Sequence, residues 1–545
     1  MMLLNKYITC SLIGEGSLAL HCAQYLLDNG HKIQSIITRD PKLQSFAKNH
    51  QLPLFSSPEN FLKTPNPPFD YLFSLSNLNI LPKKLLILAR KLAINYHDAL
   101  LPKYAGIHAT SWAIINQEKI HGITWHVMTE QVDTGNILKQ KQILIDKNET
   151  AFSLNLKCYA AGIESFSELI HQLTSHTFNE QPQDLNQRTY YAYNQKPTGN
   201  GWINWNDTAE NIERLFRALS LNQPPHHYPN RVGTLKFILN NKVYIIDNIK
   251  ITKNRSITPA GTIIKLNSNE IGISTKTKNV IIRNLKTING SLKLIKNFSM
   301  EHKLQCGDCL PSPNNKLQQY YQQLSSLLTK SDFFWMQQLK KMQPAPFSFL
   351  SLQNQQLTYK STIFSGLKLS DTLQKKIKKL LPSTSIGNVL LNAFLIYFFR
   401  STSKEVFSVE ITYPSLIEET QKINSLIANY IPLNLEFNEK LNFKKTLAKL
   451  EKQLQAIKYH RSYLTDIYIR YPELQNNYQP SFIGIIIDDL EQEKSQRQLS
   501  HPITLSFNKQ NLQIYISKSW INVNSQSILN NITKHLKTLL EDVIR

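Results

Sequence analysis

The feature that most constrains the fold is the order of elements at the start of the chain. An apolar run at residues 7–12 ends in Gly14-Glu15-Gly16, and apolar side chains then recur at helical spacing as far as Gly30. A run rich in β-branched residues follows at 32–40. This order of strand, glycine loop, helix and strand is typical of an α/β fold with a doubly wound parallel sheet. Further strand-like runs lie at 71–74, 92–96 and 123–128, and a long helical pattern lies at 149–173.

The rest of the chain predicts two more domains, which suits a length of 545 residues. We end the first domain at residue 180, because a polar segment with two prolines follows it. Residues 195–305 contain a helix and then short β-rich runs, which indicate a small β-barrel. Residues 301–330 are polar and predict a loop. Over residues 330–545 helical and strand patterns alternate, and they predict a separate α/β half-domain.

The chain is strongly basic, and its charge is uneven. The net charge is +23. Residues 1–180 hold 16 Lys and Arg against 14 Asp and Glu (+2), residues 181–315 hold 18 against 8 (+10), and the remainder holds 28 against 17 (+11). A basic middle and tail suggest an acidic partner met outside the first domain. A lysine-rich bias that only keeps the protein soluble is the alternative.

Cysteine usage and hydropathy predict a cytoplasmic protein without a membrane segment. The five cysteines are scattered, which suits reduced thiols better than a disulfide framework. Cys306 and Cys309 form one C-x-x-C, but no second ligand pair accompanies it, so we expect no metal. No cationic leader opens the chain, and no stretch approaches the roughly 20 apolar residues of a membrane helix.

The residues that carry chemistry lie between positions 93 and 145. Asn95 and His97 are two apart at the end of a predicted strand, so their side chains point the same way. A second strand at 123–128 leads to Asp133 in the turn Val-Asp-Thr-Gly. Active sites in open α/β sheets lie beyond the carboxyl ends of the strands. An amide, an imidazole and a carboxylate at one sheet edge could stabilise an oxyanion and move a proton.

The glycine loop supports a rival hypothesis. Gly14-Glu15-Gly16, with Ala19 three residues on, matches G-x-G-x-x-A between a strand and a helix, and Asp40 stands where a ribose-binding acid could sit. A dinucleotide site is one interpretation. The other is a tight strand-to-helix turn that binds no ligand, and the residues further along the chain favour it.

The motif N-x-H-x-x-L-L-P, followed by G-x-T-x-H and D-x-G-x-I-L, resembles the 10-formyltetrahydrofolate-dependent formyltransferases, which include methionyl-tRNA and glycinamide ribonucleotide formyltransferases. The resemblance covers about residues 7–300. It implies a formyltransferase catalytic domain at 1–180 and a formyltransferase-like barrel at 195–305. Ala99 departs from the family, where many relatives have serine, and this bears on contacts with the acceptor. The matching positions are Asn95, His97, Leu100, Leu101, Pro102, Gly106, Gly122, Thr124, His126, Asp133, Gly135, Ile137 and Leu138.

The resemblance implies an enzyme that moves a formyl group from 10-formyltetrahydrofolate to an amine, without a metal. Asn95 and His97 would donate hydrogen bonds to the oxygen of the tetrahedral intermediate. Asp133 would orient His97 and help to remove the amine proton. His126 is interpreted as a packed strand residue outside the site. The pterin ring of the donor would lie against residues 75–82 and 132–135, with Ser76, Asn77, Leu78, Leu81, Val132 and Gly135 as the candidate binding residues.

Residues 330–545 resemble the C-terminal half of a nonribosomal peptide synthetase condensation domain. The resemblance rests on segments 333–339, 385–415 and 429–437. The His-His-x-x-x-Asp-Gly motif of that family belongs to its other half. The one His-His pair of this chain, His226-His227, is followed by Tyr-Pro-Asn. The resemblance therefore implies a docking or structural module that does not form peptide bonds.

Together the two resemblances favour N-formylation of an amine in a nonribosomal-peptide pathway, with an amino acid or an aminoacyl group on a carrier protein as the acceptor. Carrier proteins are generally acidic, which suits the basic regions. Methionyl-tRNA formylation is the first alternative, in which the basic barrel would contact phosphates. A catalytically silent scaffold that docks a peptide synthetase is the second. The sequence does not decide the acceptor, the oligomeric state, or whether the chain is complete.

Overall fold

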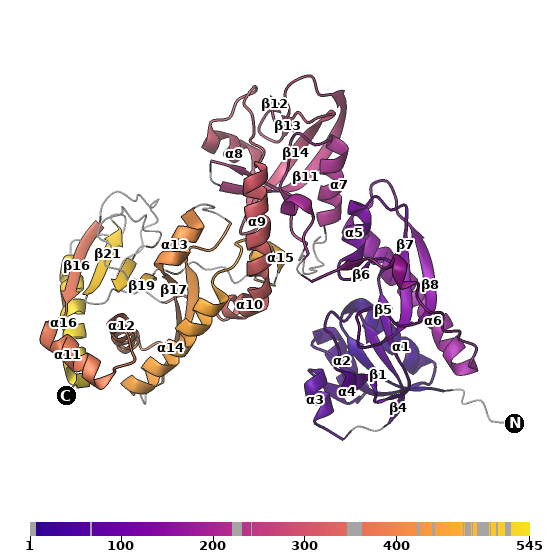
Figure 1. Cartoon of the computed structure of the whole chain (residues 1–545), viewed down its shortest axis with the longest axis horizontal. Coiled ribbons are helices and arrows are strands. Elements are labelled where there is room, and N and C mark those ends of the chain that lie inside the picture. Colours follow the sequence, from indigo (N-terminus) through magenta and orange to yellow (C-terminus); the bar gives the residue numbers. More distant parts are fainter. Residues whose placement is uncertain are drawn as a thin grey trace. The chain divides into compact units, whose positions relative to one another are not determined.

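The computed structural model describes residues 7–65, 68–193, 195–220, 232–240, 242–345, 362–421, 426–438, 442–471, 473–474, 481, 483–487, 501, 503–507, 511–517 and 525–544. The chain forms two compact units (Figure 1). The first comprises Met1–Lys236, Ile246–Arg283 and Leu304–Ser312. The second comprises Phe237–Ile245, Asn284–Lys303 and Pro313–Arg545.

A seven-stranded sheet with the order β3-β2-β1-β4-β5-β7-β8 forms the centre of the first unit. Its strands are β1 (Thr9–Gly14), β2 (Lys32–Ile37), β3 (Leu54–Phe55), β4 (Phe69–Leu75), β5 (Ala89–His97), β7 (Ile120–Val127) and β8 (Ile137–Leu144). The first five strands pair in parallel, as the opening order of elements predicted.

The sheet that was predicted to be parallel has two antiparallel strands at one edge. Strand β7 runs antiparallel to β5, and β8 runs antiparallel to β7. A parallel β7 would need a crossover connection over one face of the sheet, usually a helix that runs back along it. The nine residues of β5 span about 30 Å. The one helix between the two strands, α5 (Ala109–Ile115), has seven residues and a length of about 10 Å. The chain therefore turns back at the edge where β5 ends.

Helices cover both faces of this sheet. On one face α1 (Gly16–Asp28), α2 (Pro41–Asn49) and α6 (Ala151–Ser175) bury their apolar stripes against Tyr71, Phe73 and other sheet residues. On the other face α3 (Pro58–Leu62) and α4 (Lys83–Leu86) pack with Leu72. Residues 71, 72 and 73 alternate between the two clusters, as successive strand residues must. With both faces covered, the strand ends are left to carry a site.

The first domain is followed by a smaller, six-stranded sheet with the order β10-β11-β14-β13-β12, to which β15 is added beside β14. The short strands predicted in this region are confirmed. Helix α7 (Ala209–Leu219) precedes the sheet and α8 (Ile295–His302) follows it. The strands are β10 (Lys236–Leu239), β11 (Lys242–Arg255), β12 (Ile263–Leu266), β13 (Ile271–Ile273), β14 (Lys278–Thr287) and β15 (Leu292–Leu294).

The second unit has a mixed six-stranded sheet with the order β16-β21-β20-β19-β17-β18. Strand β19 is parallel to both β17 and β20, and the remaining pairs are antiparallel. The strands are β16 (Thr362–Lys368), β17 (Val406–Thr412), β18 (Ile431–Glu436), β19 (Ile483–Ile487), β20 (Ile503–Phe507) and β21 (Asn511–Ser517). The alternation of helices and strands predicted for this part of the chain is confirmed.

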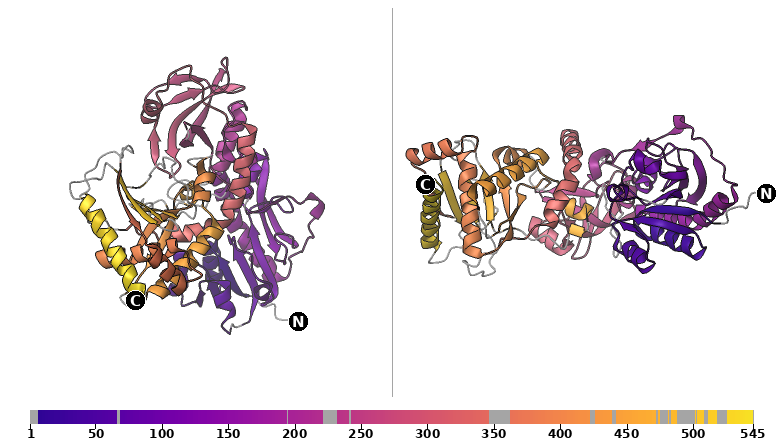
Figure 2. Two further views of the ribbon diagram at one scale, coloured as in Figure 1. Left: turned by 60° about the vertical axis from the view of Figure 1, so that its left-hand side comes forward. Right: turned by 90° about the horizontal axis from the view of Figure 1, so that it is seen from below.

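Helices pack against the sheet of the second unit. The most apolar is α12, whose buried side chains join the largest core cluster of the chain. Figure 2 shows α16 alongside the strands, and its Leu536 and Leu540 belong to the same cluster. The helices are α10 (Asp332–Lys340), α11 (Asp371–Leu380), α12 (Ile386–Thr402), α13 (Pro414–Gln421), α14 (Phe443–His460), α15 (Ile467–Arg470) and α16 (Ser525–Ile544).

The segment predicted as a loop at 301–330 contains a helix, α9 (Asn315–Leu328). Tyr321, Leu324 and Leu328 are buried on one side of it. These residues are spaced three and four apart, so they lie on one helical face. The surrounding glutamines are helix-compatible, although their polarity suggested a loop.

Across the described residues, every helix is either too short or too polar to span a membrane.

Candidate active site

Asn95 and His97 lie where β5 ends, at the carboxyl edge of the parallel strands. The antiparallel neighbour β7 brings its own polar residues level with them, because Asn95 pairs with His126 and His97 pairs with Thr124. Paired residues in a sheet project to the same face. His97 and His126 are buried, and Asn95 is half-buried. The strand register alone therefore assembles an amide and two imidazoles.

Thr124 holds the turn that follows His97. Its hydroxyl donates to the Ala99 carbonyl at 2.6 Å and accepts from the Leu101 N–H at 3.1 Å. Two residues earlier, an added Cβ at Gly122 would lie 2.2 Å from the Lys141 carbonyl and 2.6 Å from a methyl group of Leu100. Glycine is needed there for close packing. The G-x-T-x-H pattern thus supplies a close contact, an anchor for the turn, and a histidine for the site.

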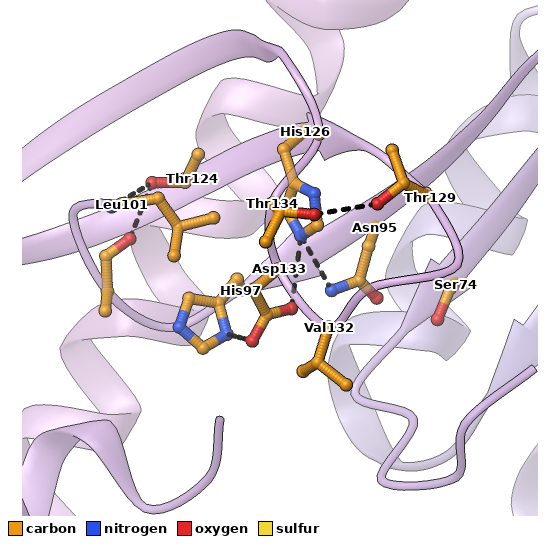
Figure 3. A network of polar contacts seen from close by, with 12 residues as sticks. Ser74, Asn95, His97, Leu101, Thr124, His126, Thr129, Val132, Asp133 and Thr134 are labelled. Atoms are coloured by element: carbon orange, nitrogen blue, oxygen red, sulfur yellow. Dashed lines mark hydrogen bonds and ion pairs between the residues drawn. The ribbon is translucent and has the colours of Figure 1, made fainter. Parts of the chain in front are cut away.

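Asp133 lies between the two histidines, as Figure 3 shows. One carboxylate oxygen is 3.6 Å from Nδ1 of His97, and the other is 3.5 Å from Nε2 of His126. The Gly106 N–H also donates to the carboxylate at 2.8 Å. Burial by itself raises the pKa of Asp133. The contacts with His97, His126 and Gly106 outweigh this effect, so the pKa lies well below its usual range.

Backbone carbonyls determine which ring nitrogens carry hydrogens. Nε2 of His97 lies 2.8 Å from the Tyr104 carbonyl, and Nδ1 of His126 lies 2.9 Å from the Val127 carbonyl. A carbonyl only accepts, so we assign a hydrogen to each of these nitrogens. Nε2 of His126 lies 3.1 Å from the Asn95 amide nitrogen and 3.5 Å from the Asp133 carboxylate. The other nitrogen of His97 faces Asp133.

His126 is packed within β7, as the sequence predicted, but its ring also contacts candidate site residues. The ring is buried, but it contacts both Asn95 and Asp133. A signal was present in the sequence. His126 is two residues from Thr124 and follows the same strand toward the turn that bears Asp133, so its side chain points to the same face as Thr124. The antiparallel register of β5 and β7, which brings His126 level with Asn95, could not be predicted from the sequence.

The candidate donor-binding residues lie in two turns at the same edge. After β4, Ser76 has a left-handed backbone with φ 52°, and its hydroxyl is buried without a hydrogen-bond partner. Asn77 closes its own turn by donating to the Asn79 carbonyl at 2.9 Å. Leu78 is 53% exposed, whereas Leu81 is buried in the apolar cluster beneath. Ser76 and Leu78 are thus the members of this turn best placed to meet a ligand.

In the second turn, Val132 is half-buried and Gly135 is buried. An added Cβ at Gly135 would lie 1.9 Å from the Val127 carbonyl, so glycine is required for packing. The turn at residues 132–135 therefore packs closely against the end of β7, and this packing fixes the position of Asp133 relative to His126.

Two other features flagged in the sequence have packing roles. Ala99 is fully buried in an apolar cluster with Trp112, so its side chain is not offered to an acceptor. In the glycine loop, an added Cβ at Gly14 would lie 2.0 Å from the Leu75 carbonyl. The Gly16 N–H at the start of α1 donates to the Asp40 carboxylate at 3.1 Å. An acid already occupies the place that a pyrophosphate would take, which disfavours a dinucleotide site.

Within the described ranges, no group of three or more His, Cys, Asp and Glu residues could hold a metal ion. Cys306 and Cys309 are exposed free thiols. The pair His226-His227 lies outside the described residues.

Comparisons with known proteins agree on one family. A family model described as formyl transferase matches residues 69–170, and one described as formyl transferase, C-terminal domain, matches residues 197–302. A methionyl-tRNA formyltransferase of Thermodesulfovibrio yellowstonii is 34% identical over 224 residues, which are 38% of this chain and 71% of the relative. That of Clostridioides difficile is 24% identical over 314 residues, 54% of this chain and 97% of the relative. A solved N-formyltransferase of Helicobacter canadensis, in complex with folinic acid and dTDP-3-aminofucose, has a TM-score of 0.39 and 22% identity, covering 51% of this chain and 99% of that one.

The first unit has the architecture of an α/β enzyme with polar side chains gathered at the carboxyl edge of its sheet. Its similarity to the Thermodesulfovibrio protein extends over most of that relative's length. The chain belongs to the formyltransferase family, and it is an enzyme that takes its formyl group from formyltetrahydrofolate.

Proposed function

We propose that the chain formylates the amino group of an aminoacyl unit held by an acidic carrier protein, in a nonribosomal-peptide pathway. The observation that carries this proposal is that the chain contains a second α/β unit in addition to the formyltransferase centre. A methionyl-tRNA formyltransferase matches over 97% of its own length yet covers only 54% of this chain. The sheet of β16–β21 lies beyond the matched family regions.

The chemistry follows from the residues at the sheet edge. The acceptor nitrogen attacks the formyl carbon, the bond from that carbon to the folate nitrogen breaks, and the amine proton ends on the folate nitrogen. Asp133, which is charged before the reaction because its pKa is lowered, accepts the amine proton directly or through water and passes it on to the folate nitrogen. Asn95 lies half-buried at the strand end, where its amide can donate to the developing oxyanion.

His97 has a more constrained role in this scheme. One ring nitrogen donates to Tyr104 and the other faces Asp133. To donate to the formyl oxygen, the ring must exchange its bond to the Tyr104 carbonyl for one to the substrate. If the ring keeps its hydrogen bond to the Tyr104 carbonyl and its contact with Asp133, His97 instead fixes the position of Asp133.

Charge supports an acidic partner for the second unit. On α11, Lys375, Lys376, Lys378 and Lys379 are exposed. The residues from 316 onward carry a net charge of +11, from 28 basic and 17 acidic side chains. Complementary charge steers association and raises its rate. The proposal therefore places the carrier on the basic surface of α11.

The test is formylation by the full chain of two acceptors side by side, a carrier protein loaded with an aminoacyl thioester and methionyl-tRNA. We expect formylation of the carrier-bound amine. The pair Lys375→Gln and Lys376→Gln should raise the KM for the carrier, whereas Lys534→Gln and Lys537→Gln on α16, which remove the same charge, should not. Efficient formylation of methionyl-tRNA with none of the carrier would overturn the proposal.

The second candidate is methionyl-tRNA formylation, which the 34% identity to a methionyl-tRNA formyltransferase favours. In that case binding of the acceptor should weaken steeply with salt, because each neutralised phosphate releases counterions. A silent scaffold is disfavoured by the contacts that join Asn95, His126 and Asp133.

A further inference from the structure

Residues 180–191, the joining segment, connect the catalytic domain to the next domain and contact the two loops that orient His97 and Asp133. The segment contains a short 3-10 helix, Leu185–Gln187, and the strand β9, Tyr190–Tyr191. Its backbone makes a reciprocal pair of hydrogen bonds between Gln181 and Ile137, at 2.7 and 2.9 Å. These bonds fix the segment at the start of β8, directly after the Asp133 turn.

Two side chains of the joining segment hold the backbone of the Asp133 turn. Gln183 donates through Nε2 to the carbonyls of Asp133 at 3.0 Å and Gly135 at 2.6 Å. Arg188 donates through Nη2 to the Val132 carbonyl at 3.0 Å. Asp133 has a left-handed backbone with φ 54°, which a residue other than glycine adopts only where its surroundings hold it. The two hydrogen bonds of Gln183 therefore hold the backbone from the carbonyl of Asp133 to the carbonyl of Gly135.

The joining segment also holds the second loop that supports His97 and Asp133, residues 104–106. Thr189 accepts from the N–H groups of Tyr104 and Ala105, at 2.8 and 2.9 Å. Strand β9 then pairs with β6 (Ala105–Gly106). Tyr104 supplies the carbonyl that accepts from His97, and Gly106 supplies the N–H that donates to Asp133. The joining segment therefore fixes the backbone groups that contact His97 and Asp133.

We propose that Gln183 is a positioning residue for formyl transfer, which acts through Asp133 by holding its backbone in the left-handed conformation that directs the carboxylate between His97 and His126. The inference rests on the formyl-transfer chemistry of the family and does not depend on which amine is the acceptor. Gln183 is half-buried, and both of its bonds go to backbone carbonyls, so its effect on the reaction is exerted through the turn.

The experiment compares two full-length variants with the wild type. Gln183→Met keeps the length of the side chain and removes both donors. Gln181→Met is the matched control, because Gln181 is exposed and its hydrogen bonds to Ile137 are made by its backbone. The readout is NMR of histidine labelled with carbon-13 at Cε1, with the signals assigned through His97→Gln and His126→Gln. The signals of His97 and His126 report the position of the Asp133 carboxylate without any acceptor present.

At fixed pH we expect Gln183→Met to displace both signals by more than their line widths, and Gln181→Met to leave them in place. Single-turnover formyl transfer to whichever of the two acceptors is active should fall about tenfold to a hundredfold, the scale of a misplaced catalytic group. If neither acceptor is formylated, the proposed acceptor is wrong, but the NMR result still decides the role of Gln183. Unchanged His97 and His126 signals in Gln183→Met would overturn it.

A second variant covers the case in which Gln183→Met does not fold. Arg188→Met removes the separate bond to Val132 at the other side of the turn. It should displace the same two signals. If both variants fail to fold while Gln181→Met folds, the joining segment is a structural tether and the positioning role is refuted.

Discussion

Asp133 is the residue on which the polar contacts of the site converge. Its carboxylate faces two histidines and accepts from a backbone N–H, although it is only 9% exposed. Replacement by asparagine keeps the shape and removes the charge. We expect Asp133→Asn to cut formyl-transfer turnover by roughly a hundredfold or more, the usual scale for loss of an acid–base group. His97→Ala should have an effect of similar size. Near-normal turnover in either variant would remove that residue from the mechanism.

The depressed pKa of Asp133 predicts a pH-dependent contribution to stability. A carboxylate with a lowered folded-state pKa stabilises the fold above its unfolded pKa of about 3.9, and this stabilisation is lost as the pH falls toward the folded value. At pH 5 the Asp133→Asn variant should be less stable than the wild type by roughly 1 to 3 kcal/mol. Between pH 4 and pH 3 the difference should shrink. Denaturant unfolding at each pH measures it, and a difference that stays constant down to pH 3 would contradict the argument.

Part of the site could be predicted from the sequence because strand parity is a local rule. Asn95 and His97 share a face by alternation alone, and Asp133 follows the next predicted strand in a turn. His126 could not be placed, because its contact with Asn95 depends on an antiparallel pairing between strands about thirty residues apart. The joining segment was also missed. Gln183 and Arg188 act through backbone carbonyls, which leave no motif in the sequence.

At the scale of elements, the predictable parts are those with a clear period. The opening β-α-β unit, the long helix α6 and most helices and strands after residue 330 follow from apolar spacing. Strand β8 was missed, because its four central residues are polar and it lies at the edge of the sheet, where one side is in solvent. Helix α9 was missed because most of its residues are polar. In both elements, polar residues hid the spacing of the apolar side chains that pack against the rest of the domain.

A buried ionic cluster joins two helices of the second unit. Arg470 on α15 makes a bidentate contact with Asp332 on α10, and a 2.7 Å contact with Asp466. All three residues are buried. Burial alone lowers the pKa of Arg470, but the two carboxylates outweigh it and keep the guanidinium charged. Removal of the cation would leave two buried carboxylates without their partner.

Arg470→Met should therefore destabilise the second unit by about 3 to 5 kcal/mol, the range for breaking a buried ion pair. Lys340→Met is the matched control on α10. Its contact with Glu473 is exposed, and it should cost about 0 to 1 kcal/mol. Urea unfolding followed by fluorescence of Trp335 on α10 measures both. Equal effects of the two substitutions would show that the cluster contributes no more than a surface pair.

At the scale of the whole molecule, the residues up to 302 and those after them have different relations to known proteins. The regions matched by the formyltransferase models end at residue 302, and 54% of the chain covers 97% of the Clostridioides difficile relative. The residues that follow build a sheet and core of their own. Because Asn95, His97 and Asp133 all lie in the first unit, the proposed function assigns residues 330–545, the tail, to the choice or delivery of the acceptor.

Deletion of residues 330–545 separates the two acceptor hypotheses. If the tail docks a carrier or a synthetase, its loss should raise the KM for a carrier-bound amine, while transfer to a small free amine survives, because Asn95, His97 and Asp133 all lie in the first unit. If the acceptor is methionyl-tRNA, the truncated chain should formylate it nearly as well as the full chain, since relatives that match over 97% of their length have no counterpart of the tail. Steady-state kinetics of both forms on both acceptors, with circular dichroism to establish that the truncated form is folded, measures this. Efficient methionyl-tRNA formylation by both forms would refute the nonribosomal-peptide proposal.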